Sequence, residues 1–321
     1  MKKIIFTFAI LAFLLGCQSK NTTENTSSTL TYTNPIIDRY MADPNMVFEN
    51  GYYYLINSHE SDDGRYLPIH KSKDLVNWEF IRGAVEKGDS TSWNYENFWA
   101  PEVMKINDTY YLYYTASPGT TPGNTGNHVG VATAKTIEGP YQDVGRVLPH
   151  SSIDGHPFID DDGSLYMYYT IEYGNVDSLT AGQIYVDKML SPTEVAGNPV
   201  QLISHHQWQE GPWILKRDGK YFLTYSVGGW DGPTYHVRYA IGDNPMGPFE
   251  EQPNKILETN EVVKGPGHHS LFRAYDKDWI VYHGWDTAFT ARYPRLDLIQ
   301  VEGDKITSNG PTFTEQTVEI D

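Results

Sequence analysis

One pattern recurs five times along this chain of 321 residues, and it constrains the fold more than any other feature. Each copy combines a proline, replaced by serine in the last copy, with a short apolar stretch, a polar turn and an aromatic stretch, as in ADPNMVFENGYYYLINS from Ala42. The proline position is occupied in turn by Pro44, Pro101, Pro157, Pro212 and Ser270. The intervals between these positions are 57, 56, 55 and 58 residues. Such a regular period is typical of a repeat architecture rather than of two unrelated domains.

Each repeat predicts a β-hairpin. An apolar strand is followed by a turn such as Asn50-Gly51 or Asp162-Gly163, and then by a strand rich in Tyr and Phe. Long helical patterns are absent, while the chain contains 28 Gly and 19 Pro. Short strands in five regular repeats predict an all-β fold, a five-bladed β-propeller over residues 34–321. A β-sandwich whose strands share turn chemistry is the alternative, but sandwiches do not usually show so long a period.

The first residues predict export. Residues 1–17, MKKIIFTFAILAFLLGC, combine two lysines with an apolar run that is too short to span a bilayer comfortably. The end of this run, LLGC, resembles the lipobox of bacterial lipoproteins, in which the cysteine, here Cys17, is lipidated and becomes the mature N-terminus. A plain signal peptide is the alternative. Residues 18–33 are polar and predict a flexible tether. We therefore expect a cell-envelope lipoprotein held at the outer membrane by its lipid anchor only.

The composition of the chain limits the classes of molecule that it could bind. With 24 Lys and Arg against 41 Asp and Glu, the formal net charge is −17, and so acidic a surface repels phosphate backbones. The charge therefore argues against nucleic acid as a partner. The single cysteine cannot form an internal disulfide. Aromatic residues make up 14% of the chain, which suits both strands and sugar-stacking pockets.

Three acidic residues stand at the starts of predicted inner strands. A propeller brings the first strand of every blade to the central axis, so we expect Asp43, Asp154 and Glu210 to share one axial pocket. Carboxyl groups that converge in this way raise one another's pKa values, which is costly unless the arrangement is used. Glycoside hydrolysis uses it, because one carboxylic acid protonates the leaving oxygen while a carboxylate activates water. Capping of a turn is the alternative for any one of them.

The motifs ADPNMVF, FWAPEV, SSIDGHPFIDDDG, EGPWILK and GPGHHSLF resemble, in order and spacing, those of glycoside hydrolase family 43. The resemblance covers about residues 34–321 and implies a five-bladed β-propeller that hydrolyses with inversion by a single displacement. It implies that Asp43 is the general base, that Glu210 is the general acid and that Asp154 tunes the pKa of the acid. No cofactor is required for this chemistry. The resemblance also places His268, of the GPGH motif, near a central structural calcium or water cluster.

Further residues are candidates for binding the substrate. The resemblance implies that Arg292 contacts the sugar in the first subsite. Trp99 and Trp213 could wall a monosaccharide pocket, with packing between blades as the alternative for each. Glu102 could bind sugar hydroxyls or brace the acids. Residues 153–157 read Ile-Asp-Gly-His-Pro, where many relatives read Ile-Asp-Pro. His156 of this run is a further candidate for contact with the substrate.

The function we expect is that of an exo-acting glycosidase that removes a terminal pentose from plant or algal polysaccharide fragments. Because both activities occur in the family, β-D-xylosidase is preferred narrowly over α-L-arabinofuranosidase. An endo-arabinanase is the other enzymatic alternative and would need an open groove. A surface lipoprotein that binds glycans without catalysis is the alternative of another class; degenerate acids would mark it, and all three acids are present.

Overall fold

The computed structural model describes residues 1, 28–119, 126–173, 179–204 and 206–320. In these ranges the chain forms strands and turns. A helix long and apolar enough to cross a membrane does not occur among them. The predicted signal peptide, Cys17 and most of the predicted tether lie outside the described residues, so they stay predictions.

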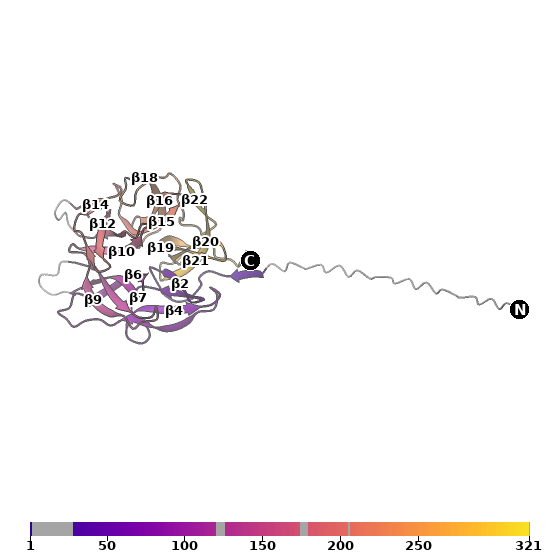
Figure 1. Cartoon of the computed structure of the whole chain (residues 1–321), viewed down its shortest axis with the longest axis horizontal. Coiled ribbons are helices and arrows are strands. Elements are labelled where there is room, and N and C mark those ends of the chain that lie inside the picture. Colours follow the sequence, from indigo (N-terminus) through magenta and orange to yellow (C-terminus); the bar gives the residue numbers. More distant parts are fainter. Residues whose placement is uncertain (2–27, 120–125, 174–178, 205, 321) are drawn as a thin grey trace.

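Five antiparallel sheets form a ring, which confirms the five-bladed β-propeller (Figure 1). Each blade is one contiguous stretch of chain that runs outward strand by strand. The blades are β2–β5 (Asn45–Glu49, Tyr52–Ile56, Tyr66–Ser72, Glu79–Val85), β6–β9 (Glu96–Ile106, Thr109–Ser117, His128–Ala134, Gln142–Arg146), β10–β14 (Ser152–Ile159, Leu165–Ile171, Ile184–Ser191, Glu194–Val195, Val200–Gln201), β15–β18 (Gln209–Arg217, Lys220–Val227, His236–Gly242, Glu250–Glu251) and β19–β22 (Lys264–Ala274, Lys277–Trp285, Arg292–Glu302, Lys305–Ser308). The repeat found in the sequence is therefore the hairpin of the two innermost strands of each blade.

The tether prediction is wrong at its C-terminal end. Residues 28–32 form β1 (Ser28–Tyr32), which pairs with β23 (Gln316–Ile320) in a two-stranded sheet outside the blades. Leu30 and Tyr32 alternate with exposed residues and are buried against the fifth and first blades. A strand with one apolar face is stable there because that face is covered. The two ends of the propeller therefore lie side by side (Figure 1).

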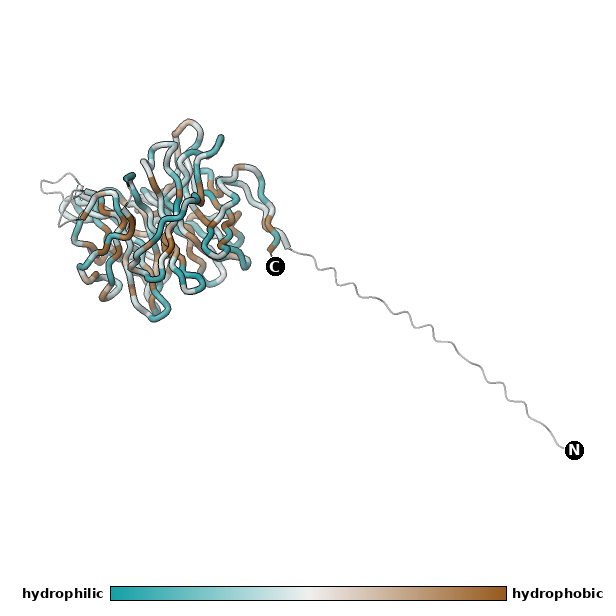
Figure 2. The backbone as a smooth tube through the Cα atoms, turned by 90° about the horizontal axis from the view of Figure 1, so that it is seen from above, coloured by the Kyte–Doolittle hydropathy of each residue, from teal (hydrophilic) through white to brown (hydrophobic). Residues whose placement is uncertain are grey.

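The hydrophobic core is divided among the five seams between neighbouring blades. In β3, Tyr53 and Leu55 face the seam with the fifth blade, while Tyr54 and Ile56 face the seam with the second. Successive side chains of a strand point to opposite faces, so a strand covered on both faces is apolar throughout. This explains the continuous aromatic stretch of every repeat. Apolar segments accordingly run along the strands in the interior of the molecule, and hydrophilic segments lie mostly in the outer loops (Figure 2).

Candidate active site

Every blade has a residue in the left-handed region at an equivalent point of its inner strand, which in the first blade lies just before β2. These five residues have φ between 42° and 60°, recur at intervals of 57, 54, 57 and 57, and are Asp43, Ala100, Asp154, Gly211 and His268. Glycine and aspartate tolerate this conformation better than most residues. In β6, β10, β15 and β19 the pairing with the second strand shifts its register around this position. Two of the three predicted acids stand at this turn, and Glu210 directly precedes Gly211.

A cavity of about 560 Å³ opens over these turns. Its size falls within the range of roughly 300–1,000 Å³ that is typical of small-molecule sites. All five blades and the segments joined to them contribute to its wall, through Tyr40, Asp43, His59, Trp99, Ile153, Asp154, Glu172, Tyr173, Trp208, Glu210, Gly228, Gly229, Trp230, Asp231, His268 and Arg292. The three predicted acids therefore share one pocket, although more than a hundred residues separate the first from the second.

Asp43 lies on the cationic side of the pocket. Its Oδ1 lies 3.5 Å from Arg292 Nη1 and 3.7 Å from His268 Nδ1. Its Oδ2 accepts a hydrogen bond from the Ser58 hydroxyl, at the end of the first hairpin. The guanidinium of Arg292 lies over the Trp230 ring at 4.6 Å. Ring and carboxylate together fix this arginine beside Asp43.

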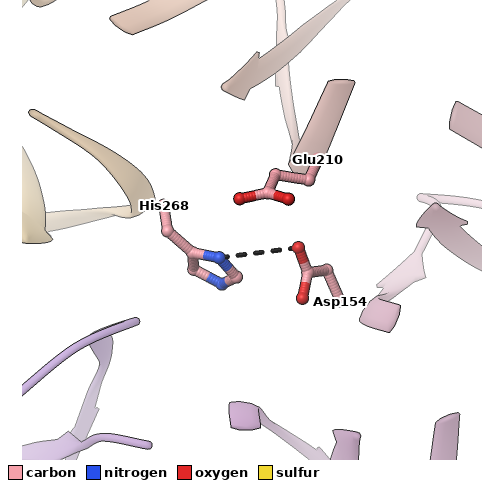
Figure 3. Close-up of side chains that lie close together, drawn as sticks. All are labelled: Asp154, Glu210 and His268. Atoms are coloured by element: carbon pink, nitrogen blue, oxygen red, sulfur yellow. Dashed lines mark ion pairs between the residues drawn. The ribbon is translucent and has the colours of Figure 1, made fainter. Parts of the chain in front are cut away.

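Glu210 and Asp154 lie together across the pocket. The Trp208 indole donates to Glu210 Oε2 at 2.7 Å, and the Tyr235 hydroxyl donates to Oε1 at 2.6 Å. His268 Nδ1 lies 3.6 Å from Asp154 Oδ2. One polar atom from each of Asp154, Glu210 and His268 lies within 4.8 Å of the other two, and the three side chains point toward one another from separate strands (Figure 3).

The fold and this group of acids agree with a comparison against known families. The sequence pattern of the glycosyl hydrolases family 43 matches residues 32–306, which is most of the chain. The chain belongs to glycosyl hydrolase family 43. It is therefore a glycoside hydrolase, as the resemblance in the motifs implied.

Individual members of family 43 resemble this hydrolase over most of their length. A β-D-galactofuranosidase of Aspergillus niger is 31% identical and is aligned over 91% of this chain and 88% of its own. A β-xylosidase of Xylanibacter ruminicola is 29% identical over 76% of this chain and 87% of its own. Among solved structures, a thermostable family 43 glycoside hydrolase superposes with a TM-score of 0.78 and 30% identity, over 89% of this chain and 98% of that one.

In this family 43 hydrolase the Asp43 carboxyl is held ionised. Burial alone would raise its pKa, but the neighbouring His268 and Arg292 and a hydrogen bond with His283 hold that pKa well below the usual range. Arg292 supplies the positive charge at pH 7, because burial lowers the pKa of His268 and its imidazole is then neutral. Asp43 is therefore suited to accept a proton.

The opposite pair of carboxyls retains a proton. Burial raises the pKa of Glu210 to about 6, although the hydrogen bonds from Tyr235 and Trp208 act against the rise. Burial and the neighbouring Glu210 and Asp43 raise the pKa of Asp154 well above its usual value. Because the two carboxyls interact, the proton belongs to the pair rather than to one residue. One pocket thus contains both a proton acceptor and a proton donor.

The calcium expected near His268 stays a prediction. Asp154, Glu210 and His268 could offer one donor atom each, and one of these atoms is a nitrogen. Calcium takes six to eight oxygen ligands, and both Glu210 oxygens already accept hydrogen bonds. The described residues therefore do not form a calcium cage by themselves.

Several predicted site residues lie where the sequence places them. Trp99, Arg292 and His268 line the cavity with the three acids. Trp230, a further aromatic at the rim, is 46% exposed and stacks on Trp285 with ring centroids 6.1 Å apart. An exposed indole at a pocket rim offers an apolar face to a sugar ring.

Glu102, His156 and Trp213 lie deeper, and we correct the expectation that they contact the substrate. Each follows a left-handed turn by two residues, so each side chain falls on the channel side but about 7 Å further along its strand. Glu102 Oε2 accepts from Asn45 Nδ2 at 3.0 Å and lies 3.4 Å from His156 Nδ1. The rings of His156 and Trp213 pack together with centroids 4.4 Å apart. Glu102 and His156 are buried in the channel beneath the pocket. Trp213 also packs against the hydrophobic cluster between the fourth and fifth blades, which was the alternative for it.

The residues that hold the acids were not predicted from the sequence. Trp208 precedes Glu210 by only two residues, and this short spacing could have indicated it. Tyr235 belongs to the turn before β17 and carries no motif. Glu172 follows the second strand of the third blade and accepts from the backbone N–H of Asn127 at 3.0 Å. It meets the pocket only through packing between blades, which no local pattern encodes.

Proposed function

We propose that this family 43 hydrolase is an inverting, exo-acting glycosidase that removes terminal pentose residues from plant or algal polysaccharide fragments. One observation carries the proposal: an ionised Asp43 shares a pocket with a pair, Asp154 and Glu210, that retains a proton. Inverting hydrolysis needs one carboxyl group of each kind on opposite faces of the sugar.

In the proposed reaction, Asp43 accepts a proton from a water molecule whose oxygen attacks the anomeric carbon. Glu210 gives its proton to the glycosidic oxygen as the bond from that oxygen to the anomeric carbon breaks. Asp154 keeps a proton on the pair until it is transferred, because ionisation of both carboxyls would place two negative charges side by side in a buried site. Arg292 binds the sugar from the side of the base. The products are a free sugar of inverted configuration and the shortened glycan.

The shape of the pocket supports exo action. Segments of all five blades surround the acids, and the rim carries Tyr40, Trp99, Tyr173, Trp208 and Trp230. An exo-acting enzyme accepts the end of a chain in a pocket, whereas an endo-arabinanase would need a groove that is open on two sides. Aromatic walls suit the apolar faces of a single sugar ring.

We propose β-D-xylose as the sugar, with α-L-arabinofuranose as the enzymatic alternative. The β-xylosidase of Xylanibacter ruminicola supports the first choice. A second candidate is a terminal β-D-galactofuranose, because the relative of that activity matches 91% of this chain at 31% identity. The three sugars differ in ring size and in the group attached to the ring, so the walls of the pocket decide between them.

The experiment is a rate comparison on 4-nitrophenyl β-D-xylopyranoside, α-L-arabinofuranoside and β-D-galactofuranoside, together with xylo-oligosaccharides. The proposal predicts the largest kcat/KM on the xylopyranoside and stepwise release of xylose from the oligosaccharides. A larger kcat/KM on either furanoside would show that the terminal sugar is that furanose rather than xylose. Release of long fragments from linear arabinan would show endo rather than exo action. Binding of glycans without turnover of any substrate would favour the non-catalytic lipoprotein.

We also propose that the protein is an outer-membrane lipoprotein, lipidated at Cys17. The lipobox-like LLGC at the end of the apolar run supports this location. Fractionation of the producing cells tests it. We expect the parent chain in the membrane fraction and Cys17→Ser in the soluble fraction. Equal distribution of the two would leave only a plain signal peptide.

We propose that the hydrolysis needs no cofactor, because carboxyl groups of the chain supply both proton transfers. Treatment with EDTA followed by a rate measurement tests this directly. Unchanged kcat supports the proposal, while loss of activity that calcium restores would assign the ion expected near His268 a role in catalysis.

A further inference from the structure

A ring of side chains from the second strands joins each blade to the next. These residues recur at intervals of 57, 55, 56 and 57 and are Ser58, Thr115, Thr170, Ser226 and His283. The Ala100 N–H donates to Ser58 Oγ at 2.8 Å, and the Asp154 N–H donates to Thr115 Oγ1 at 3.1 Å. The ring thus satisfies backbone N–H groups that the left-handed turns remove from sheet pairing.

The same arrangement recurs in the later blades. The His268 N–H donates to Ser226 Oγ at 2.8 Å. Between the third and fourth blades, Thr170 Oγ1 instead donates to the Gln209 carbonyl at 3.2 Å, and Asp154 accepts the N–H of Gly211. A hydroxyl is therefore the connecting group at four of the five seams.

The fifth seam, which closes the ring between the last blade and the first, differs. Here an imidazole replaces the hydroxyl, and His283 Nδ1 lies 3.2 Å from the Asp43 backbone nitrogen. The same atom lies 3.1 Å from Asp43 Oδ1. A serine hydroxyl reaches less far from the backbone than the ring, so only the longer side chain contacts both groups. The exceptional residue of the ring thus faces the proposed base.

His283 is also held firmly. Its side chain is fully buried, and its ring is nearly parallel to that of Tyr235, with centroids 5.9 Å apart and an angle of 6°. The ring of His268 also lies beside it, with centroids 6.3 Å apart and an angle of 22° between the planes. Burial lowers the pKa of His283 to about 3, so its imidazole is neutral during the reaction. Whichever nitrogen bears the proton, Nδ1 is bound to Asp43, either to its N–H or to its carboxylate.

An imidazole at this position lowers the stability of the fold in a way that a serine would not. His283 Nε2 is buried and has no hydrogen-bond partner. Leaving a buried polar atom unpaired lowers stability, and closing the seam alone requires only a hydroxyl. The contact with the Asp43 carboxylate is what the imidazole adds.

We propose that His283 is a positioning residue that fixes the Asp43 carboxylate for attack by water. With its proton on Nδ1, His283 donates to Oδ1 beside Arg292, and Ser58 donates to Oδ2, so the base is bound from both sides of the closing seam. The inference rests on the proposed role of Asp43 as general base.

The test compares His283→Ser, which makes the seam like the other four, with His283→Asn, whose amide reaches close to the position of Nδ1. Ser270→Ala is the matched control. Ser270 Oγ connects the same two blades, accepting from Met46 N at 3.1 Å and donating to the Pro44 carbonyl at 3.2 Å, but it contacts none of the acids. Urea unfolding establishes that each variant is folded before its rates are measured.

We expect His283→Ser to lower kcat by about 10- to 100-fold with little change in KM, because a displaced base loses part of its contribution. The loss should be equal on 4-nitrophenyl glycosides and on natural oligosaccharides, since a misplaced base slows water attack for every leaving group. His283→Asn should recover part of kcat, and Ser270→Ala should retain the parental kcat. A parental kcat in folded His283→Ser, or a loss confined to natural substrates, would overturn the proposal.

A crystal structure of His283→Ser separates this inference from the proposed function. We expect the Asp43 carboxylate to be displaced or to occupy two conformations, while Ser270→Ala leaves it in place. An unmoved carboxylate would overturn the positioning role even if the enzyme were active. Failure of the parent chain to hydrolyse any glycoside would instead count against the proposed function, and the crystal structure would still decide the question for His283.

Discussion

At the scale of single residues, the site depends on the different pKa values that similar carboxyl groups have within one pocket. Asp43 lies 3.5 Å from a permanent cation, Arg292, and stays ionised. Glu210 is equally buried but receives only neutral donors, so burial dominates and its pKa rises to about 6. The identity of the three acids could be predicted from their common place in the repeats. Their protonation could not, because Arg292 and Tyr235 reach them from distant parts of the chain.

The raised pKa of Glu210 predicts the pH dependence. The acid must be protonated, so kcat/KM should fall as the pH rises above about 6. Tyr235→Phe removes a hydrogen bond that favours the charged form, so the pKa of Glu210 should rise and the alkaline limb should move up by about one unit. Tyr239→Phe removes a buried hydroxyl of the same blade that bonds to the Asp304 carbonyl, and it should leave the limb in place. A downward shift for Tyr235→Phe would contradict the assignment.

The roles of the two carboxyls predict different substrate dependences. Glu210→Gln should lower kcat by more than about 100-fold on natural oligosaccharides but much less on 4-nitrophenyl glycosides, whose leaving group needs little protonation. Asp43→Asn should abolish both activities alike, because water must be activated in each case. Steady-state rates on the two substrate types measure the difference. Parental turnover of natural glycosides by Glu210→Gln would show that the acid is another residue.

At the scale of the strand, depth along the channel separates pocket residues from core residues. Asp154 and His156 are two residues apart on β10, yet only Asp154 lines the pocket. The period of the repeat indicates which face a residue occupies, but the left-handed turn sets where the pocket ends. Nothing in the sequence around Glu102 or His156 marks that boundary, so their burial in the channel could not be predicted.

The ring of connecting side chains predicts that loss of one of its hydroxyls lowers the free energy of unfolding. Thr115→Val keeps the shape of the side chain but leaves the buried Asp154 N–H without its acceptor. We expect the free energy of unfolding to fall by roughly 1–3 kcal/mol. Thr317→Val, on the exposed side of β23, should change it by no more than about 0.5 kcal/mol. Urea denaturation measures both, and equal values for the two variants would contradict the connecting role.

At the scale of the whole molecule, closure of the ring brings distant acids together. Asp43 and Asp154 are 111 residues apart in the sequence, and Asp154 and Glu210 are 56 apart. They meet in space because the last blade closes against the first, where β19 and β2 are neighbours. Five equal repeats were enough to predict the ring. They could not predict the β1–β23 sheet, because these strands lie outside the repeat and β1 reads as part of a polar segment.

The β1–β23 sheet should contribute to the stability of the closing seam. Leu30 is 6% exposed and packs in the cluster between the fifth and first blades. Leu30→Ala should therefore lower the free energy of unfolding by roughly 2–5 kcal/mol, through lost burial and the cavity that remains. Thr29→Ala, on the exposed face of the same strand, is the control and should be nearly neutral. Equal unfolding midpoints would mean that the sheet is not part of the cooperative fold.

The central claim is that Asp43 activates water while Glu210 protonates the leaving oxygen from the other face of the sugar. Proton NMR of the sugar released in the first minutes of hydrolysis tests it most directly, because the anomer is observed before mutarotation. A β-D-xyloside should yield α-D-xylose first. Initial release of β-D-xylose would show retention through a covalent intermediate and would contradict the assignment of Asp43 as a base.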